Sequence, residues 1–486
     1  MQKENKSKFM NFLVKNRFLI AVLFISLFFR IVQYSNNIVW WDSAAYIEMG
    51  KYIFSAGSIG LWEDSRPLVL SFILGEFWKL GINPLVAGKI LMIFFSLGTI
   101  WLTYTIARKI FNENIAVMAS LMLSFSQTFF FYDTQILTGI PSLFFALLGL
   151  YLFLDKTHVL SGLVLCIAFM TRFLQLGVFA VLSLFLFFNW ITAKGSIKKK
   201  KFKAMFKFGA GFSILFIPYL IFNYCLYSNP LLPFLRQAYM SKYTGWQWWE
   251  PFSFYFTNLF KENFLLLFAI LGIFLILRNL KRYNKESENS FIILTIFLFY
   301  FAYFTSIIHK EMRFAITFSP YLFMITSFGI FWLYQKLANG KKTKHYSLIF
   351  SIILLLTWLY IILMPGKLFQ EQSQNTVTVF QEYADSLNSS EGLWISSPNQ
   401  LLLSDKKADE LMYYPTFNEA KISYLKSNAQ NAKIIFLDTC DVPCPPWEPD
   451  CPKIKLDFIE SFKKNFNIIY QNEISDCQKY IFSKNQ

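Results

Sequence analysis

The first outer stretch of the chain, residues 40–48, reads Trp40-Trp41-Asp42-Ser43-Ala44-Ala45-Tyr46-Ile47-Glu48 and directly follows the first long apolar segment. Its two carboxylates, Asp42 and Glu48, therefore stand where the chain leaves a bilayer, beside tryptophans of the kind that favour headgroup depth. Charges at this place can form a solvated collar on the first membrane helix. The alternative is a catalytic carboxylate at the outer surface, facing a substrate whose lipid tail stays in the membrane.

The composition of the whole chain indicates a polytopic α-helical membrane protein. Of its 486 residues, 55% are hydrophobic and only 16% are charged, whereas a soluble protein of this length carries roughly 25% charged residues. The net charge of +16 could suggest nucleic acid, but the basic residues concentrate in short loops between apolar segments. Cytoplasmic loops have this pattern under the positive-inside rule. We therefore expect no nucleic-acid partner, and an uncleaved first helix with its N-terminus inside.

Eleven apolar segments are long enough to span a bilayer, which takes about 20 residues. They lie near 17–35, 84–108, 114–132, 136–154, 157–174, 175–193, 206–227, 262–280, 290–308, 313–335 and 345–364. A shorter segment, 67–80, contains Glu76 and Lys79. If it crossed, every later basic loop would lie on the side opposite the basic N-terminus. We therefore predict that 67–80 is an interfacial helix on the outer face.

This arrangement places two long loops, 36–83 and 227–261, on the outer side of the membrane. The second loop is dense in tryptophan and tyrosine, which is typical of an anchor in the aromatic belt or of a platform for a sugar or lipid; the two roles are compatible. The candidate substrate-binding residues in the two loops are Tyr46, Tyr243, Trp246, Trp248 and Trp249.

A polar turn at 308–313 is also predicted to lie outside. It holds four ionisable residues between two apolar segments, which is costly at a membrane unless they face water or one another. Lys310 and Arg313 suit a phosphate group, lysine as a point charge and arginine as a bidentate fork. His309 can donate a hydrogen bond or relay a proton.

Three further polar residues are candidates for the same outer face. Arg66 precedes Pro67, which is pre-organised to start a helix, and would stand at the mouth of the interfacial helix. Asp133 is either a third catalytic carboxylate or a helix cap. Arg172 is either a buried, paired arginine or a substrate contact.

Residues 366–486 predict a separate α/β domain of about 110 residues. Short apolar runs predict strands at 393–397, 433–437, 466–470 and 479–482, and helical periodicity covers 377–387, 418–427 and 454–465. On an oxidising outer side, its cysteines are expected to form two disulfides, with three pairings open. A zinc site made of four thiolates is the alternative, although the chain here has no Cys-x-x-Cys. These cysteines are Cys440, Cys444, Cys451 and Cys477.

In this order, the features resemble the GT-C superfamily of membrane glycosyltransferases, and in particular the protein O-mannosyltransferases and the lipid A aminoarabinose transferase. The resemblance covers most of 13–365. Trp41-Asp42 followed by Tyr46 resembles the first outer-loop motif of the family, whose aspartate is the catalytic or metal-proximal carboxylate. His309-Lys310-Glu311-x-Arg313 resembles the signature of eukaryotic GPI and dolichol-pathway mannosyltransferases.

Two more segments carry the resemblance, and one departs from it. Arg66-Pro67-Leu68 resembles the basic-proline helix of the family, and the segment from Thr138 to Phe145 resembles its second acidic motif. At the usual acidic position before Ile-Pro this chain has Gly139. A two-carboxylate metal site therefore lacks one ligand, which Asp133 or Glu48 could replace, and a divalent metal is left open.

The resemblance implies an inverting glycosyltransferase in the plasma membrane, with the domains 1–365 and 366–486. A polyprenyl (dolichyl-type) phosphate sugar would be the donor, and a protein, lipid or glycan the acceptor on the outer face. Asp42 would act as general base, and Arg66, Lys310 and Arg313 would neutralise the leaving phosphate. The alternative is a transporter or flippase of an anionic lipid or small solute. Transporter sites lie near the bilayer midplane, whereas these charges collect at helix ends on one face.

Overall fold

The computed structural model describes residues 16–33, 39–280, 285–338, 375–387, 392–412, 419–444, 446–474 and 476–484. The chain divides into two compact units. The first consists of 1–36, 89–231 and 250–369, and the second of 37–88, 232–249 and 370–486. The segment 37–88 thus groups with the C-terminal residues.

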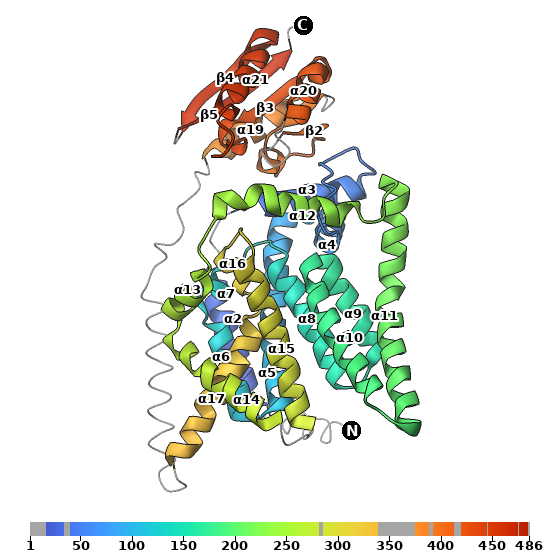
Figure 1. The fold of residues 1–486 in the computed structure, drawn as a ribbon. Coiled ribbons are helices and arrows are strands. Elements are labelled where there is room, and N and C mark those ends of the chain that lie inside the picture. The colour runs from blue at the N-terminus through green and yellow to red at the C-terminus, as the bar shows by residue number, and fades with distance from the viewer. Residues whose placement is uncertain are drawn as a thin grey trace, which may run out of the picture. The chain divides into compact units, whose positions relative to one another are not determined.

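The first unit is a bundle of helices (Figure 1). Its elements are α2 (Arg17–Gln33), α5 (Pro84–Ile110, whose first residues belong to the second unit), α6 (Glu113–Ser124), α7 (Gln127–Tyr132), α8 (Gly139–Leu154), α9 (His158–Thr171), η1 (Phe173–Gln175), α10 (Leu176–Ile191), α11 (Gly195–Tyr227), α13 (Phe254–Glu262), η3 (Phe264–Leu267), α14 (Phe268–Asn279), α15 (Lys285–Ser306), α16 (Met312–Ala315) and α17 (Ser319–Ala338).

These helices fall where the apolar segments predict them. Ten of the eleven predicted spans contain helix, and the eleventh, 345–364, lies outside the described residues. Within the described part of the chain, four helical stretches are long and apolar enough to cross a membrane by length and composition: Pro84–Ile110, Phe173–Ile191, Gly195–Tyr227 and Glu286–Ser306. The polytopic helical class is confirmed, and the number of eleven crossings stays a prediction.

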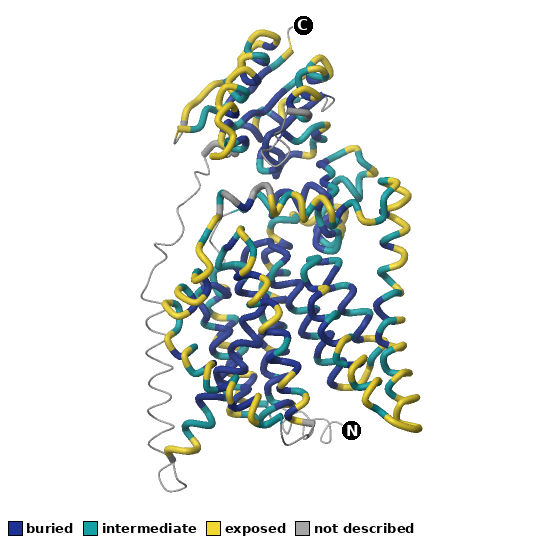
Figure 2. Tube along the Cα trace, viewed as in Figure 1, coloured by how far each residue is buried: buried dark blue, intermediate teal, exposed yellow. Residues whose placement is uncertain are grey.

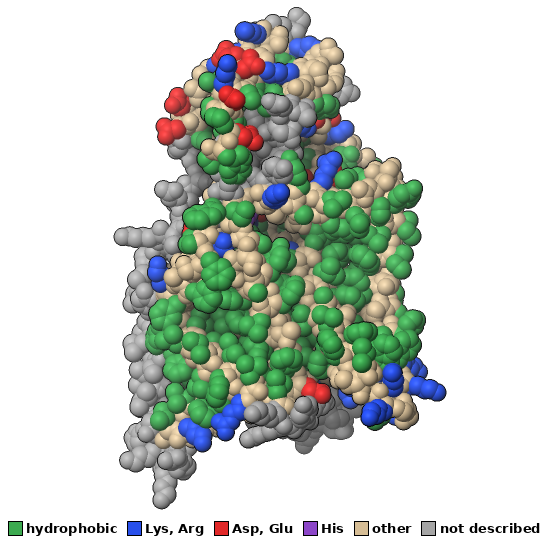
Figure 3. Space-filling model, viewed as in Figure 1, with side chains coloured by type: hydrophobic (Ala, Val, Ile, Leu, Met, Phe, Trp, Pro, Cys, Tyr) green, Lys and Arg blue, Asp and Glu red, His purple; other side chains and the backbone are tan. Residues whose placement is uncertain are grey.

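Small residues bring helices of the first unit into backbone contact. A Cβ on Gly162 of α9 would lie 2.1 Å from the carbonyl oxygen of Phe208, and one on Gly211 of α11 would lie 2.1 Å from that of Val159. Such close approach is how membrane helices pack without a hydrophobic driving force. Buried residues follow the inner faces of the bundle (Figure 2), and hydrophobic side chains cover the visible outer face (Figure 3).

The C-terminal part of the second unit forms the predicted α/β domain. Its sheet has the order β2-β1-β3-β5-β4, with β1 parallel to β2 and β3, and β5 antiparallel to β3 and β4. The elements are α19 (Asn375–Ser386), β1 (Leu393–Ile395), η5 (Pro398–Leu401), β2 (Glu410–Leu411), α20 (Glu419–Asn428), η7 (Ala429–Asn431), β3 (Ile434–Asp438), η8 (Thr439–Asp441), α21 (Cys451–Asn465), β4 (Phe466–Ile474) and β5 (Cys477–Lys484). The four predicted strands and three predicted helices are confirmed, and β2 is an addition.

The helices α3 (Trp41–Phe54) and α4 (Val69–Lys79) belong to the same unit as this domain, and α3 shares a core with it. Met49 and Leu61 lie in one apolar cluster with Leu393, Ile395 and Phe436. The backbone of Gly60 also donates to Lys406 O at 2.8 Å and accepts from Ala408 N at 2.9 Å. The segment is therefore an integral part of the second unit. α4 confirms a helix within 67–80, and its interfacial place stays a prediction.

The aromatic segment 227–261 is not the loop that the sequence predicted. It forms α12 (Leu232–Thr244), η2 (Gly245–Trp248) and α13. The reason is composition, because seven of the thirteen residues of α12 are leucine, arginine, glutamine, alanine, methionine or lysine, which favour helix. Trp249 is exposed, and the side chains of Tyr243, Trp246 and Trp248 lie outside the described part.

Two disulfides close the C-terminal domain. Cys440 pairs with Cys477, and Cys444 pairs with Cys451, which resolves the three open pairings. All four sulfurs are used in this way, so the alternative zinc site of four thiolates does not form.

Candidate functional site

A three-residue ion cluster lies at the start of α3. Asp42, in the first turn of that helix, is 2.9 Å from Nη1 of Arg66. Arg66 Nε donates to Glu63 Oε2 at 2.5 Å. The guanidinium lies over the rings of Trp41 and Tyr46, 5.0 and 5.1 Å from their centroids. The predicted residues Asp42, Tyr46 and Arg66 are thus brought together.

The charges of this cluster leave one carboxylate in excess. Burial alone would lower the pKa of Arg66, but Glu63 and Asp42 raise it well above its usual value. Glu63 also accepts from Ser65 Oγ at 3.1 Å, and its side chain is 5% exposed, against 30% for Asp42. Asp42 is therefore the more accessible of the two carboxylates that contact Arg66. Glu63 was not predicted as a site residue, although it stands three residues before Arg66.

Glu48 occupies a different environment from Asp42. Its side chain is fully buried, 3.0 Å from Lys51 Nζ. Burial raises the pKa of Glu48 to about 8 although Lys51 opposes this shift. Six residues along an α-helix turn by about 600°, so the two carboxylates point from different faces of α3. The structure does not bring Glu48 to Asp42.

Asp133 belongs to a buried ion pair of the first unit. It lies 2.7 Å from Nη2 of Arg30, and both side chains are fully buried. Arg30 Nε also donates to Ser96 Oγ at 2.8 Å, and Phe129 and Phe130 flank its guanidinium. Arg30 was not predicted as a site residue, although an arginine inside the first apolar segment is a signal, because a charge there needs a partner.

The polar turn of the first unit is organised around Glu311. Its carboxylate contacts His309 Nε2 at 2.5 Å and accepts from Arg313 Nη2 at 2.8 Å. Burial would raise the pKa of Glu311, but Arg313 and His309 outweigh it and lower the pKa. The buried Lys310 donates instead to the carbonyl oxygen of Glu250 at 2.8 Å. Of the three predicted phosphate-binding residues of this turn, His309 and Arg313 are thus held by Glu311, and Lys310 is held separately by the Glu250 carbonyl.

Arg172 lies beside this turn and beside the position where the acidic residue is missing. Its guanidinium is 5.4 Å from the ring centroid of Phe314. A Cβ built on Gly139 would lie 3.4 Å from Nη1 of Arg172. The first residue of α8, Gly139, therefore lies next to the Arg172 guanidinium, at the position where the acidic motif would supply a carboxylate.

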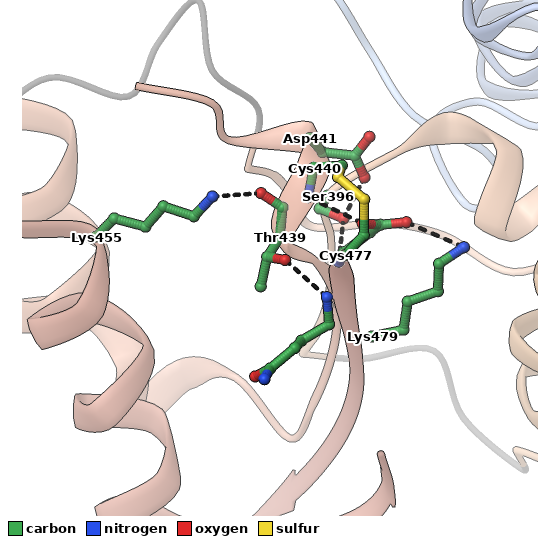
Figure 4. Close-up of a disulfide and its surroundings, with 9 residues drawn as sticks. Ser396, Thr439, Cys440, Asp441, Lys455, Cys477 and Lys479 are labelled. Carbon is green, nitrogen blue, oxygen red and sulfur yellow. Dashed lines mark hydrogen bonds and ion pairs between the residues drawn. A yellow bond between two sulfur atoms is a disulfide. The ribbon is translucent and has the colours of Figure 1, made fainter. Parts of the chain in front are cut away.

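The described residues offer no good ligand set for a divalent metal near the predicted site residues. At Asp42 the place of a cation is taken by Arg66, whose charge repels a metal ion. One other group, Asp438, Cys440 and Cys477, has ligand atoms within 4.8 Å of one another. However, its cysteines are joined in a disulfide, and Asp438 pairs with Lys479 at 3.3 Å (Figure 4).

The comparisons with known proteins agree with this architecture. A family model described as dolichyl-phosphate-mannose-protein mannosyltransferase matches residues 65–222. The solved structure of ArnT from Cupriavidus metallidurans bound to undecaprenyl phosphate matches with a TM-score of 0.60 and 11% identity, over 97% of this chain and 98% of that chain. This chain has the GT-C fold. The predicted fold is thereby confirmed.

Other GT-C structures match over a similar length. The Archaeoglobus fulgidus oligosaccharyltransferase tethered with an acceptor peptide gives a TM-score of 0.60 and 12% identity, over 98% of this chain and 75% of that chain. AglB from the same organism, in complex with an inhibitory peptide and a dolichol-phosphate, gives a TM-score of 0.58 and 13% identity, over 97% of this chain and 75% of that chain. No curated protein sequence matches the chain.

Proposed function

We propose that this GT-C protein is an inverting glycosyltransferase that moves a sugar from a polyprenyl monophosphate carrier to an acceptor on the outer face of the membrane. The observation that carries the proposal is the partly exposed carboxylate of Asp42, fixed by Arg66 at the start of α3. The match to the mannosyltransferase family model supports it. So do the undecaprenyl phosphate and dolichol-phosphate bound to the similar structures.

In this mechanism Asp42 is the general base. It accepts the proton of the acceptor hydroxyl while the acceptor oxygen forms a bond to C1 of the sugar. The bond from C1 to the phosphate oxygen breaks, and the polyprenyl phosphate leaves with the electron pair. General-base assistance of this kind contributes about 10²–10⁴-fold. Arg66, already shared by two carboxylates, serves to orient Asp42 in this proposal; the sequence analysis had assigned it to the donor phosphate.

The donor phosphate is proposed to bind the cationic turn of the first unit. A monoester leaving group develops a second negative charge, so fixed cations aimed at it lower the barrier. Arg313 offers a fork and Lys310 a point charge, and Glu311 holds Arg313 and His309 in place. The sugar is proposed to be a hexose or a pentose, and the acceptor a protein, lipid or glycan.

The test is transfer or release of labelled sugar from polyprenyl-phosphate mannose, glucose and aminoarabinose by the purified protein in detergent. We expect Asp42→Asn to lower turnover by at least about 100-fold. Asp457→Asn, which removes a carboxylate that is 71% exposed, should leave turnover unchanged. Activity of Asp42→Asn within a few-fold of wild type would assign the base elsewhere. A parallel assay with a chelator tests whether turnover requires a divalent metal.

Failure of the wild type to turn over any lipid donor would favour the transporter. The next experiment would then be lipid flux across the membrane of liposomes that contain the protein.

A further inference from the structure

Lys51 is a buried lysine on α3 that the mechanism does not use. Its side chain is 3% exposed, and it lies nine residues after Asp42 on the same helix. The ammonium donates to the backbone oxygens of Leu402 at 3.2 Å and Ser404 at 2.8 Å. It also lies 3.0 Å from Glu48 Oε1 and 3.6 Å from Asp405 Oδ1. All of these acceptors except Glu48 lie more than 350 residues away in the sequence.

The carbonyls that Lys51 meets stand just after the short helix η5, which follows β1. The last carbonyls of a helix lack partners within it, and a cation there is favourable. The other end of η5 is already closed by a capping box of Ser397 and Gln400. Lys51 therefore ties α3 to the residues that directly follow η5.

A second connection joins the same two regions a few residues further along. Gly60 bridges Lys406 and Ala408 through its backbone, at a φ of +81° that favours glycine. The connection at Lys51 acts through a side chain on α3 itself. Together with the packing of Met49, it therefore fixes the rotation of the helix that carries Asp42.

We infer that Lys51 is a positioning residue, which fixes α3, and with it the Asp42 carboxylate, on the C-terminal domain. The inference rests on the proposed function in taking Asp42 as the base. Arg66 orients the Asp42 carboxylate at the first turn of α3, and Lys51 anchors the third turn of the helix to the backbone of residues 402–404. Glu48 is then the buried partner of Lys51, and Asp42 acts alone as the base.

The first test measures the connection without using activity. In Lys51→Met, amide hydrogen exchange in full-length protein should become at least tenfold faster at Ser404 and Ala408, whose N–H groups donate to Leu401 O and Gly60 O. Lys426→Met is the matched control, because that lysine pairs at the surface with Asp457. Exchange that stays at the wild-type rate in Lys51→Met overturns the inference, whatever the protein is found to catalyse.

The second test separates positioning from charge neutralisation. Lys51→Met should lower kcat at least tenfold with the donor KM within about twofold, and Lys51→Arg should recover part of the loss. The variant Lys51→Met/Glu48→Leu replaces both members of the buried pair by apolar groups, which is often neutral for stability. We expect it to regain the wild-type Tm but not the wild-type kcat. Full recovery of kcat would mean that Lys51 only neutralises Glu48, and overturns the inference.

The two tests also separate this inference from the proposed function. A wild-type protein that turns over no lipid donor contradicts the proposed function, and the exchange rates then decide whether Lys51 holds the segment 402–408.

Discussion

At the scale of single residues, Arg66 joins two carboxylates and two aromatic rings, and a lysine cannot copy this set of contacts. Its planar fork reaches Asp42 and Glu63 at once, whereas an ammonium is a point charge. We predict that Arg66→Lys lowers kcat by at least tenfold. Arg66→Met should also lower the Tm, because Glu63 would remain buried without its counter-charge.

Steady-state turnover and thermal unfolding in detergent check this prediction. Arg236→Lys is the control, since Arg236 is 54% exposed and pairs with Asp64. An Arg66→Lys variant as active as wild type would remove the orienting role of Arg66.

Glu48 makes the stability of the second unit depend on pH. Burial raises its pKa to about 8 in the folded protein, above roughly 4.3 in an unfolded chain. The folded state therefore binds this proton more tightly, so the stabilisation is complete at low pH and is lost as pH rises through about 8. Lys51 and Asp405 are the charged groups that face it.

We predict that wild type loses Tm relative to Glu48→Gln between pH 5 and pH 8, by at least roughly 2 °C. Unfolding followed by fluorescence across this range is the measurement, with the exposed Glu382→Gln as the control. A constant difference between wild type and Glu48→Gln would contradict the pKa shift.

The sequence identified Asp42 and Arg66 because charges beside a membrane segment stand out by position alone. The sequence could not show that Glu48 is buried, because its partner Lys51 donates to backbone carbonyls that lie more than 350 residues away along the chain. The pairing of Asp133 with Arg30 was hidden for the same reason. A helical position does not reveal which distant residue it meets.

At the scale of elements, the two disulfides close loops of unequal length. Cys440–Cys477 spans 37 residues and Cys444–Cys451 spans 7. Because the entropy removed from the unfolded chain grows as 1.5R times the logarithm of loop length, the longer loop should contribute about 1.5 kcal/mol more. We predict that Cys440→Ser/Cys477→Ser lowers the Tm more than Cys444→Ser/Cys451→Ser. Thermal unfolding without reductant tests this, and the reverse order would contradict the loop argument.

Elements were predictable where local pattern decides them. Short apolar runs predicted β1, β3, β4 and β5, since a buried strand is apolar whatever its neighbours are. The strand β2 was missed because two residues carry no periodicity. α12 was missed because its tyrosines and the tryptophans that follow it drew the interpretation toward a loop, although most of its other residues favour helix.

At the scale of the whole molecule, sidedness is the property that the basic loops predict. We expect a cysteine at the exposed position Ser427 to react with a membrane-impermeant maleimide added to intact cells. One at the exposed Lys199 should react only after permeabilisation. Cys225, which is also exposed, would be replaced by serine in both variants. Labelling in the opposite order would invert the topology and place the disulfides on the reducing side.

The shared core of α3 and the sheet also has a consequence for biogenesis. Met49 packs in a cluster with Ile395 and Phe436, so the helix with Asp42 leaves the ribosome long before the residues that complete its packing. At about 5–20 residues per second, the delay is roughly 20–70 s. During that interval α3 lacks the residues that complete its core, and a chain that stops before the C-terminal domain never acquires them. Folding of the C-terminal domain is therefore the step that completes the packing of the helix with Asp42.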